Sequence, residues 1–249
     1  TIAMKFSSRL GKLAPYPFVE ISRIIAAKRA EGADVVTFGI GDPDMPTPQP
    51  IIDRLLIASQ QAPNHRYPET DGLPELRRAI AHWYQQRFGV ELDPDKEVLP
   101  LIGAKEGIGH AALCFLDPGD LALVPDPGYP VYAVGTLFAG GESYALPLLE
   151  KNGWLPDLDA IPKDVAGKAR VMWLNYPNNP AGTTLSEERL KEIAKVCSEF
   201  KILVLSDEIY GEVNHDGQHV SLATFYPEGT IISGGLSKWC GAGGGRLGT

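Results

Sequence analysis

The stretch KILVLSDEIY, residues 201–210, joins a run of apolar residues to a polar cluster. A short apolar run bounded by turn signals is typical of a strand buried on both faces of a parallel sheet. In open α/β sheets, ligands bind beyond the carboxyl ends of the strands. We therefore expect residues 202–205 to form a buried strand, with Asp207 and Tyr210 at the edge where a ligand binds.

The same pattern recurs along the chain. Short apolar runs at residues 121–124, 171–174 and 230–232 predict further strands. Helical patterns separate them: one stripe follows Pro74 and stops at Gly89, and a second, near residues 184–197, begins with Thr184 and Glu187 spaced as a capping box. This alternation predicts a three-layer α/β/α domain with a mostly parallel, mixed sheet.

Composition narrows the class of protein. Of the 249 residues, 44% are hydrophobic and 22% charged, as in soluble globular proteins. The net charge of -8 argues against a nucleic-acid partner, which needs a basic face. No apolar run approaches the roughly 20 residues of a membrane helix, and no signal-peptide core is visible. We expect a cytoplasmic protein without a membrane partner.

The cysteines indicate neither a disulfide framework nor a metal site. Their number is odd, they are widely spaced, and they form no CxxC motif. We expect Cys114 and Cys197 to be small core residues. Cys240 is either reactive or packed, and packing is the favoured reading.

The first 40 residues differ from the rest. A helix is expected at about residues 19–30, preceded by Pro15-Tyr16-Pro17. We therefore divide the chain into an N-terminal arm, residues 1–40, and a domain, residues 41–249. The long proline-rich connections inside the domain are candidate functional loops.

The stretch GLSKWCGAGGGRLG, residues 235–248, places an amine, a hydroxyl and a guanidinium close together. The amine of Lys238 could form a Schiff base with the aldehyde of pyridoxal phosphate, while Ser237 and Arg246 hold its phosphate. The alternative is an ordinary glycine-rich surface loop with a solvated lysine.

Polar residues after the other strands favour the cofactor. Pyridoxal phosphate needs an acid to keep its ring nitrogen protonated, and Asp207 follows a buried strand. The amide of Asn179 and the hydroxyl of Tyr210 could donate to the ring oxygen. For Asp207 the alternative is a helix cap or a surface salt bridge.

A phosphate is commonly bound by backbone N–H groups at the start of a helix. The sequence GAKEG, residues 103–107, opens a helix expected to reach Phe115, so the backbone of Ala104 and Lys105 would face the anion. Tyr129, in a Pro-Gly-Tyr-Pro loop, could stack on the ring. The alternatives are a simple helix cap and a packed turn tyrosine.

In this order and spacing, the motifs resemble the class I/II aminotransferases of fold type I, which use pyridoxal phosphate. The resemblance covers essentially the whole chain and rests on GDPD at residues 41–44, YPETDGLPELR at 67–77, NNPAG at 178–182, SDEIY at 206–210, and Ser237-Lys238 with Arg246.

The resemblance implies a role for each matching residue. Lys238 would be the Schiff-base lysine, Asp207 the partner of the ring nitrogen, and Tyr129 the stacking residue. Asn179 and Tyr210 would bind the ring oxygen, and the phosphate would be held by Ala104, Lys105, Ser237 and Arg246. A tyrosine placed as Tyr67 reaches the phosphate of the neighbouring subunit, which implies a homodimer with shared active sites. The backbone of Gly41 would approach the substrate, which Asn179 would also contact.

Within the family, several stretches look most like LL-diaminopimelate aminotransferases and their alanine- or aspartate-type relatives. They include GAKEGI at residues 103–108 and DPGYPVY at 126–132. On this reading Tyr16 would contact substrate.

The chain departs from the family pattern in three ways. Gly235 stands where many members have a phosphate-binding serine, and Gly245 where a tryptophan commonly precedes the arginine. Family members also continue for well over a hundred residues after the lysine, into a small C-terminal domain that grips the substrate carboxylate. We therefore expect this sequence to lack that domain.

The implied reaction is transamination between an amino acid and a 2-oxo acid, with 2-oxoglutarate as the expected acceptor and LL-diaminopimelate, aspartate or alanine as donor. Two alternatives keep the cofactor: a C-S β-lyase on the same scaffold, and a non-catalytic cofactor-binding module of a regulator.

Overall fold

The computed structural model describes residues 5–39, 41–215 and 217–249 and divides the chain into two units, Thr1–Asp44 and Met45–Thr249. The first unit holds a short 3-10 helix, η1 (Leu10–Lys12), and α1 (Pro17–Ala30). Proline at the first helical position has no N–H to lose, so α1 begins directly after Tyr16. The predicted helix at residues 19–30 falls within α1.

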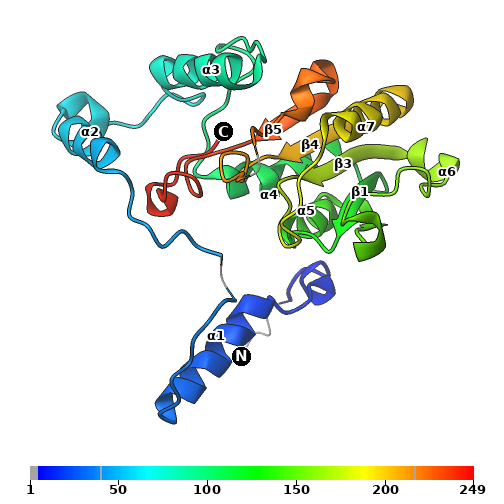
Figure 1. The fold of residues 1–249 in the computed structure, drawn as a ribbon, viewed down its shortest axis with the longest axis horizontal. Coiled ribbons are helices and arrows are strands. Elements are labelled where there is room, and N and C mark those ends of the chain that lie inside the picture. The colour runs from blue at the N-terminus through cyan, green and yellow to red at the C-terminus, as the bar shows by residue number, and fades with distance from the viewer. Residues whose placement is uncertain (1–4, 40, 216) are drawn as a thin grey trace. The chain divides into compact units, whose positions relative to one another are not determined.

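The second unit is built on one parallel sheet (Figure 1). Its strands are β1 (Leu121–Asp126), β2 (Glu142–Pro147), β3 (Ala169–Asn175), β4 (Leu203–Asp207) and β5 (Thr230–Ser233), in the order β2-β1-β3-β4-β5. Asn175 of β3 pairs with Asp207 of β4, which pairs with Ser233 of β5, so three strands end in register. The prediction of an α/β domain is confirmed.

Helices connect the strands and cover both faces of the sheet (Figure 1). The α-helices of this unit are α2 (Gln49–Ser59), α3 (Pro74–Phe88), α4 (Ala104–Phe115), α5 (Val131–Ala139), α6 (Lys163–Ala166) and α7 (Glu187–Phe200). Short 3-10 turns are η2 (Ala62–His65), η3 (Glu150–Asn152), η4 (Leu222–Thr224), η5 (Pro227–Gly229) and η6 (Gly243–Gly245). As predicted, α3 starts at Pro74 and stops before Gly89, which caps the helix with a left-handed φ of 67°.

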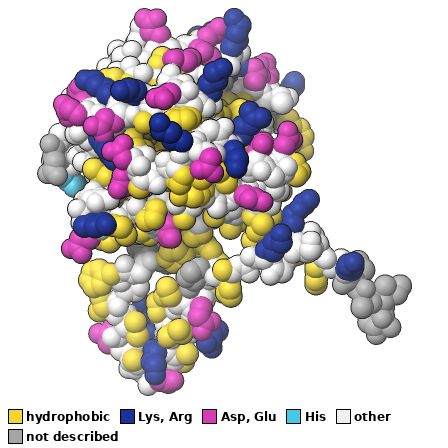
Figure 2. Space-filling view, turned by 90° about the vertical axis from the view of Figure 1, so that its right-hand side faces the viewer, with side chains coloured by type: hydrophobic (Ala, Val, Ile, Leu, Met, Phe, Trp, Pro, Cys, Tyr) yellow, Lys and Arg dark blue, Asp and Glu magenta, His cyan; other side chains and the backbone are white. Residues whose placement is uncertain are grey.

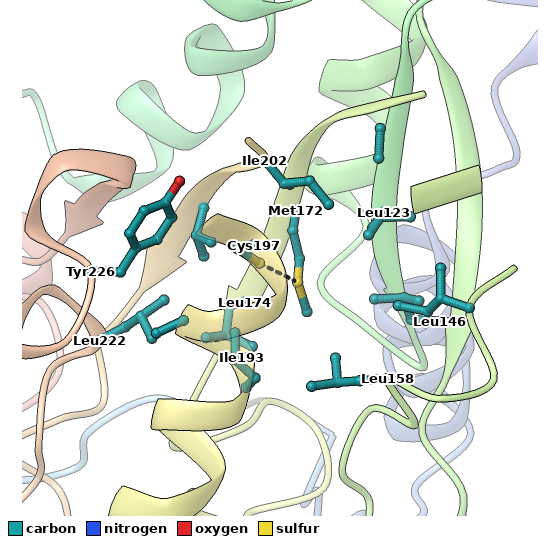
Figure 3. Packing of buried hydrophobic residues seen from close by; sticks show 14 of the residues in the cluster. Leu123, Leu146, Leu158, Met172, Leu174, Ile193, Cys197, Ile202, Leu222 and Tyr226 are labelled. Atoms are coloured by element: carbon teal, nitrogen blue, oxygen red, sulfur yellow. Dashed lines mark hydrogen bonds between the residues drawn. The ribbon is translucent and has the colours of Figure 1, made fainter. Parts of the chain in front are cut away.

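The alternation of side chains along β3 divides the core into two layers. Met172 and Leu174 point to the face covered by α7, whereas Val171 and Trp173 point to the face covered by α4 and α5. Figure 3 shows the first layer, in which the thiol of Cys197 on α7 lies 3.7 Å from the sulfur of Met172. Close packing on both faces of the sheet holds the ends of the strands rigidly. The polar residues of the predicted site lie at those ends.

Three features differ from expectation. The cap of α7 is Ser186, whose hydroxyl accepts the N–H of Arg189, so the predicted capping box of Thr184 and Glu187 is wrong. Cys114 is exposed rather than a core residue, because it lies on the outer side of α4. Strand β2 was not predicted: it is an edge strand whose residues are mostly solvent-accessible, so it lacks an apolar run.

Figure 2 shows one face of the molecule, where basic and acidic side chains are interspersed among the described residues. Among the helices that the structure describes, none is long and apolar enough to cross a membrane.

Candidate active site

The carboxyl ends of β3 and β4 are tied together by one amide side chain. Asn175 is almost fully buried, and its Nδ2 donates to the backbone oxygen of Asp207 at 2.9 Å. Its Oδ1 accepts the backbone N–H of Asn179 at 2.9 Å. Because one side chain satisfies groups from both segments, the loop that carries Asn179 is held beside the end of β4.

Asp207 is a buried carboxylate at this edge, only 4% exposed. Its Oδ2 accepts a hydrogen bond of 2.7 Å from the hydroxyl of Tyr132, and its Oδ1 accepts the N–H of Ile209 at 3.3 Å. Burial raises the pKa of Asp207 to about 6, the hydrogen bonds from Tyr132 and Ile209 oppose that rise, and the neighbouring charge of Glu208 adds to it. Asp207 is thus mostly ionised at pH 7 and strongly attracts a cation or a proton.

Tyr132 is a site residue that sequence reasoning missed. It is fully buried on α5, and its ring stacks on Trp173 with the centroids 4.8 Å apart. Burial and the charge of Asp207 raise the pKa of Tyr132 well above its ordinary value, so its hydroxyl stays protonated and donates. The signal available was its position three residues after Tyr129, at the start of a helix that follows a buried strand.

A second group of side chains gathers around Tyr210. The Nδ2 of Asn179 donates to the hydroxyl oxygen of Tyr210 at 3.3 Å, and the Nζ of Lys238 lies 5.6 Å from the centre of the Tyr210 ring. Burial raises the pKa of Tyr210 above its ordinary value. An amide, a phenol and a primary amine from three separate segments therefore meet at the carboxyl edge of the sheet.

The start of α4 forms a cradle with Arg246. Gly103 precedes the helix with a φ of 81°, a conformation that favours glycine, and a Cβ there would collide with the guanidinium of Arg246. Arg246 donates to the carbonyl of Ile102 at 3.3 Å and to that of Gly243 at 2.8 Å. The first N–H groups of a helix attract anions, so the guanidinium and the helix start together favour a phosphate-like group.

Backbone pairing brings Arg246 to that position. After Lys238 the chain turns back, and Gly234 and Thr249 exchange two hydrogen bonds of 3.0 Å. Leu101 and Gly248 form an antiparallel bridge with bonds of 2.8 and 3.0 Å, directly before α4. A Cβ on Gly248 would collide with the backbone of Ala104, so this close approach requires glycine.

The structure places the other predicted residues in different ways. Tyr129 joins the site: its ring lies 5.7 Å from the Tyr132 ring, and the Nζ of Lys105 is 5.8 Å from its centre. Ser237 is half-buried in the turn that carries Lys238. Tyr67 is fully exposed, between η2 and α3. Tyr16 and Gly41 belong to the first unit, so they are not placed relative to this site.

Within residues 5–39, 41–215 and 217–249, no group of three or more His, Cys, Asp or Glu side chains is arranged to hold a metal ion. What the arrangement offers is an amine, a buried carboxylate, hydrogen-bond donors and an anion cradle. These groups suit a ligand that carries an electrophilic carbon, a basic nitrogen and a phosphate.

Comparison with known proteins agrees with this reading. The family model described as aminotransferase class I and II matches residues 33–249. The LL-diaminopimelate aminotransferase of Dehalococcoides mccartyi is 56% identical over 214 residues, which cover 86% of this chain and 55% of the relative. The chain thus spans about half the length of the curated relatives it matches.

Solved structures show the same fold. A double mutant of the aspartate aminotransferase of Thermus thermophilus superposes with a TM-score of 0.91 at 28% identity, covering 99% of this chain and 64% of that one. The alanine aminotransferase of Pyrococcus furiosus gives a TM-score of 0.91 at 32% identity, covering 98% and 62%.

Proposed function

Because the chain belongs to the class I and II aminotransferases, we propose that it carries the cofactor-binding part of an enzyme that moves an amino group between an amino acid and a 2-oxo acid. The cofactor we propose is pyridoxal 5'-phosphate. The observation that carries the proposal is the meeting of Lys238, Tyr210 and Asn179 beside the buried Asp207.

The residues at the site fit this cofactor. The cradle of Arg246 and the start of α4 would hold the phosphate, together with Ser237 and the backbone of Ala104 and Lys105. Neither position 104 nor position 235 carries a hydroxyl, so Ser237 and Arg246 would contribute a larger share of the phosphate contacts. Tyr129 would cover one side of the ring.

The polar groups around the ring have separate tasks. The ionised Asp207 would hold a proton on the ring nitrogen, and Tyr132 would keep that carboxylate oriented and charged. Because Tyr210 accepts from Asn179, its own hydroxyl proton is left to donate to the ring oxygen.

When bound, pyridoxal phosphate supplies an aldehyde that amines attack and a ring that withdraws electrons from the substrate α-carbon. Lys238 would first hold the cofactor through its Nζ. When not attached to the cofactor, the same Nζ would accept the proton from the substrate α-carbon as a general base and later give it up as a general acid. Lys238 must therefore be able to move, whereas Asp207 must not.

We further propose LL-diaminopimelate as the amino donor and 2-oxoglutarate as the acceptor. The proposal is supported by the identity of 56% to an enzyme named for that donor. We also propose a homodimer in which the fully exposed Tyr67 reaches the partner's phosphate site, with Gly41 and Tyr16 near the substrate.

A panel of amino donors with 2-oxoglutarate tests both the proposed reaction and the proposed donor. We expect glutamate to form with LL-diaminopimelate. Glutamate formed only with alanine or aspartate would refute the donor but keep the reaction. Ammonia and pyruvate released from a cysteine-type substrate, without need for an oxo acid, would instead show a lyase.

A further inference from the structure

Two indole rings stack at the residue that follows Lys238 in the chain. The ring of Trp239, the residue after Lys238, lies against the ring of Trp83 on α3, with centroids 5.6 Å apart and planes within 7° of parallel. Both side chains remain about 40% exposed, at 40% for Trp83 and 42% for Trp239. The pair is therefore not part of the buried core, so core packing does not explain why the two rings are stacked.

The segment that follows has little side-chain support of its own. A Cβ added to Gly244 or Gly245 would meet nothing within 4 Å, and one added to Gly243 would meet only a carbonyl oxygen at 3.7 Å. Glycine backbones lose the most conformational entropy on ordering, so such a run holds its neighbours weakly. Backbone hydrogen bonds support this turn, among them those from the N–H of Leu236 to Leu247 and from the N–H of Ala242 to Leu236, so a side-chain contact next to Lys238 adds to them.

Beyond the indoles, Cys240 is buried, and the next residue, Gly241, contacts a distant segment of the chain. Its carbonyl accepts the hydroxyl of Thr47 at 3.0 Å, and its φ of 58° brings it against the backbone at Met45. Lys238 thus lies between the end of β5 at Ser233 and this contact, and the Trp83–Trp239 pair begins at the residue after it.

Trp83 can act as a support because α3 is itself firmly attached. Tyr84 packs with Val90 and Ala223 in a small core cluster that also contacts Ile232 of β5. Arg87 pairs with Glu212 at 2.9 Å, and the hydroxyl of Thr224 lies 3.4 Å from the carbonyl of Phe88. Consecutive turns of α3 therefore fix Trp83 relative to the strand that leads to Lys238.

We propose that Trp83 is a positioning residue for Lys238: its stack on Trp239 helps to hold the backbone at the lysine. The inference rests on the proposed function, because it concerns how Lys238 meets the cofactor. Gly245, which directly precedes Arg246, carries no side chain, whereas the Trp83–Trp239 pair provides an aromatic contact at the residue directly after the lysine.

The test uses paired substitutions in the protein. Trp83→Leu and Trp239→Leu each remove the stack, Trp83→Phe and Trp239→Phe keep an aromatic ring, and Trp154→Phe is a control for loss of a tryptophan elsewhere. Circular dichroism of the cofactor-free protein first reports the indole pair, because two stacked indoles give a paired positive and negative signal. We expect that signal to vanish in every variant of Trp83 or Trp239 and to persist in the control.

Two further readouts separate positioning from general stability. Hydrogen exchange of the peptide containing residues 236–245 should speed up in both leucine variants, with α7 unchanged. The rate at which added pyridoxal phosphate becomes attached to Lys238, trapped by borohydride, should fall roughly 2- to 10-fold, which is what an aromatic pair contributes. The double leucine variant should be no slower than either single one, and the phenylalanine variants should recover most of the rate.

The outcomes are distinguishable. Unchanged exchange and attachment rates in both leucine variants would overturn the positioning role while leaving Lys238 as the attachment site. Additive losses in the double variant would also overturn it, since the two rings would then act separately. If the wild-type protein never attaches the cofactor at Lys238, the proposed function fails and the inference fails with it.

Discussion

The two sides of the proposed cofactor site are built in opposite ways. On the side of β3 and β4, Asp207 is buried and receives hydrogen bonds from Tyr132 and Ile209, and Asn175 ties its backbone to the next loop. On the side of the lysine, the chain is rich in glycine and partly exposed, and backbone pairs and one exposed aromatic stack hold it. Charge stabilisation needs groups that are fixed in advance, whereas a group that carries a proton between two atoms needs freedom.

The largest effect is expected on the lysine side. Lys238→Ala should lower turnover by about 10²- to 10⁴-fold or more, because no other group would carry the proton. Its effect on stability should be small, since Lys238 is half-buried on a loop. Steady-state assays with an amino donor and 2-oxoglutarate measure the loss, and Lys191→Ala on the exposed side of α7 is the control. Turnover retained in the Lys238 variant would mean that the amine is not catalytic.

On the fixed side, Asp207→Asn should lower turnover by about 10²- to 10³-fold, as loss of a preorganised charge does. It should also stabilise the cofactor-free protein. The raised pKa of about 6 means that the folded state holds a proton which the unfolded state has lost, so native Asp207 costs stability as pH rises from about 4 to 6.

Urea unfolding at several pH values measures this difference. Wild type and Asp207→Asn should be equally stable near pH 3.5, and the variant should gain up to about 3 kcal/mol above pH 6. A wild-type protein that is as stable as the variant at pH 7 would contradict the burial of a charged Asp207.

A smaller effect tests how Asp207 is held. Tyr132→Phe removes the hydrogen bond that lowers the pKa of Asp207, so the pH range over which stability falls should extend upward beyond 6. Loss of a hydrogen bond to a charged group should cost about 1.5 to 3 kcal/mol in the ionised state. Tyr144→Phe on β2 is the matched control. Identical pH profiles for the two variants would show that Tyr132 does not act on Asp207.

The smallest effect concerns the phosphate cradle. Gly103→Ala combines an unfavourable left-handed backbone with a collision against Arg246, and we expect a loss of about 1 to 2 kcal/mol in stability together with weaker cofactor affinity. Gly119→Ala is a fair comparison, since its φ is 91° but a Cβ there would meet nothing within 4 Å. It should show the backbone cost without the loss of affinity. Equal affinity in both variants would argue against Arg246 as a phosphate ligand.

The strands and the residues directly after them were predictable because they depend on local patterns. A buried strand such as β4 needs an apolar run, and topology then places Asp207 at the ligand edge. Edge strand β2 lacks such a run and gave no comparable signal.

Contacts between distant segments were harder to predict. Tyr132 lies 75 residues before Asp207, and a tyrosine at a helix start looks the same whether it packs or donates. The Trp83–Trp239 stack depends on how α3 packs against β5. No sequence pattern near either tryptophan predicts that packing. Local chemistry thus predicts which residues line the edge, and tertiary packing decides which of them touch.

The central claim is that Lys238 is the amine that binds the cofactor. The most direct measurement is to incubate the protein with pyridoxal phosphate, reduce with borohydride and map the modified lysine by peptide mass spectrometry. The account predicts a single label on Lys238, with Lys105, the other lysine at the site, unmodified. A label on Lys105, or labels spread over surface lysines, would contradict it.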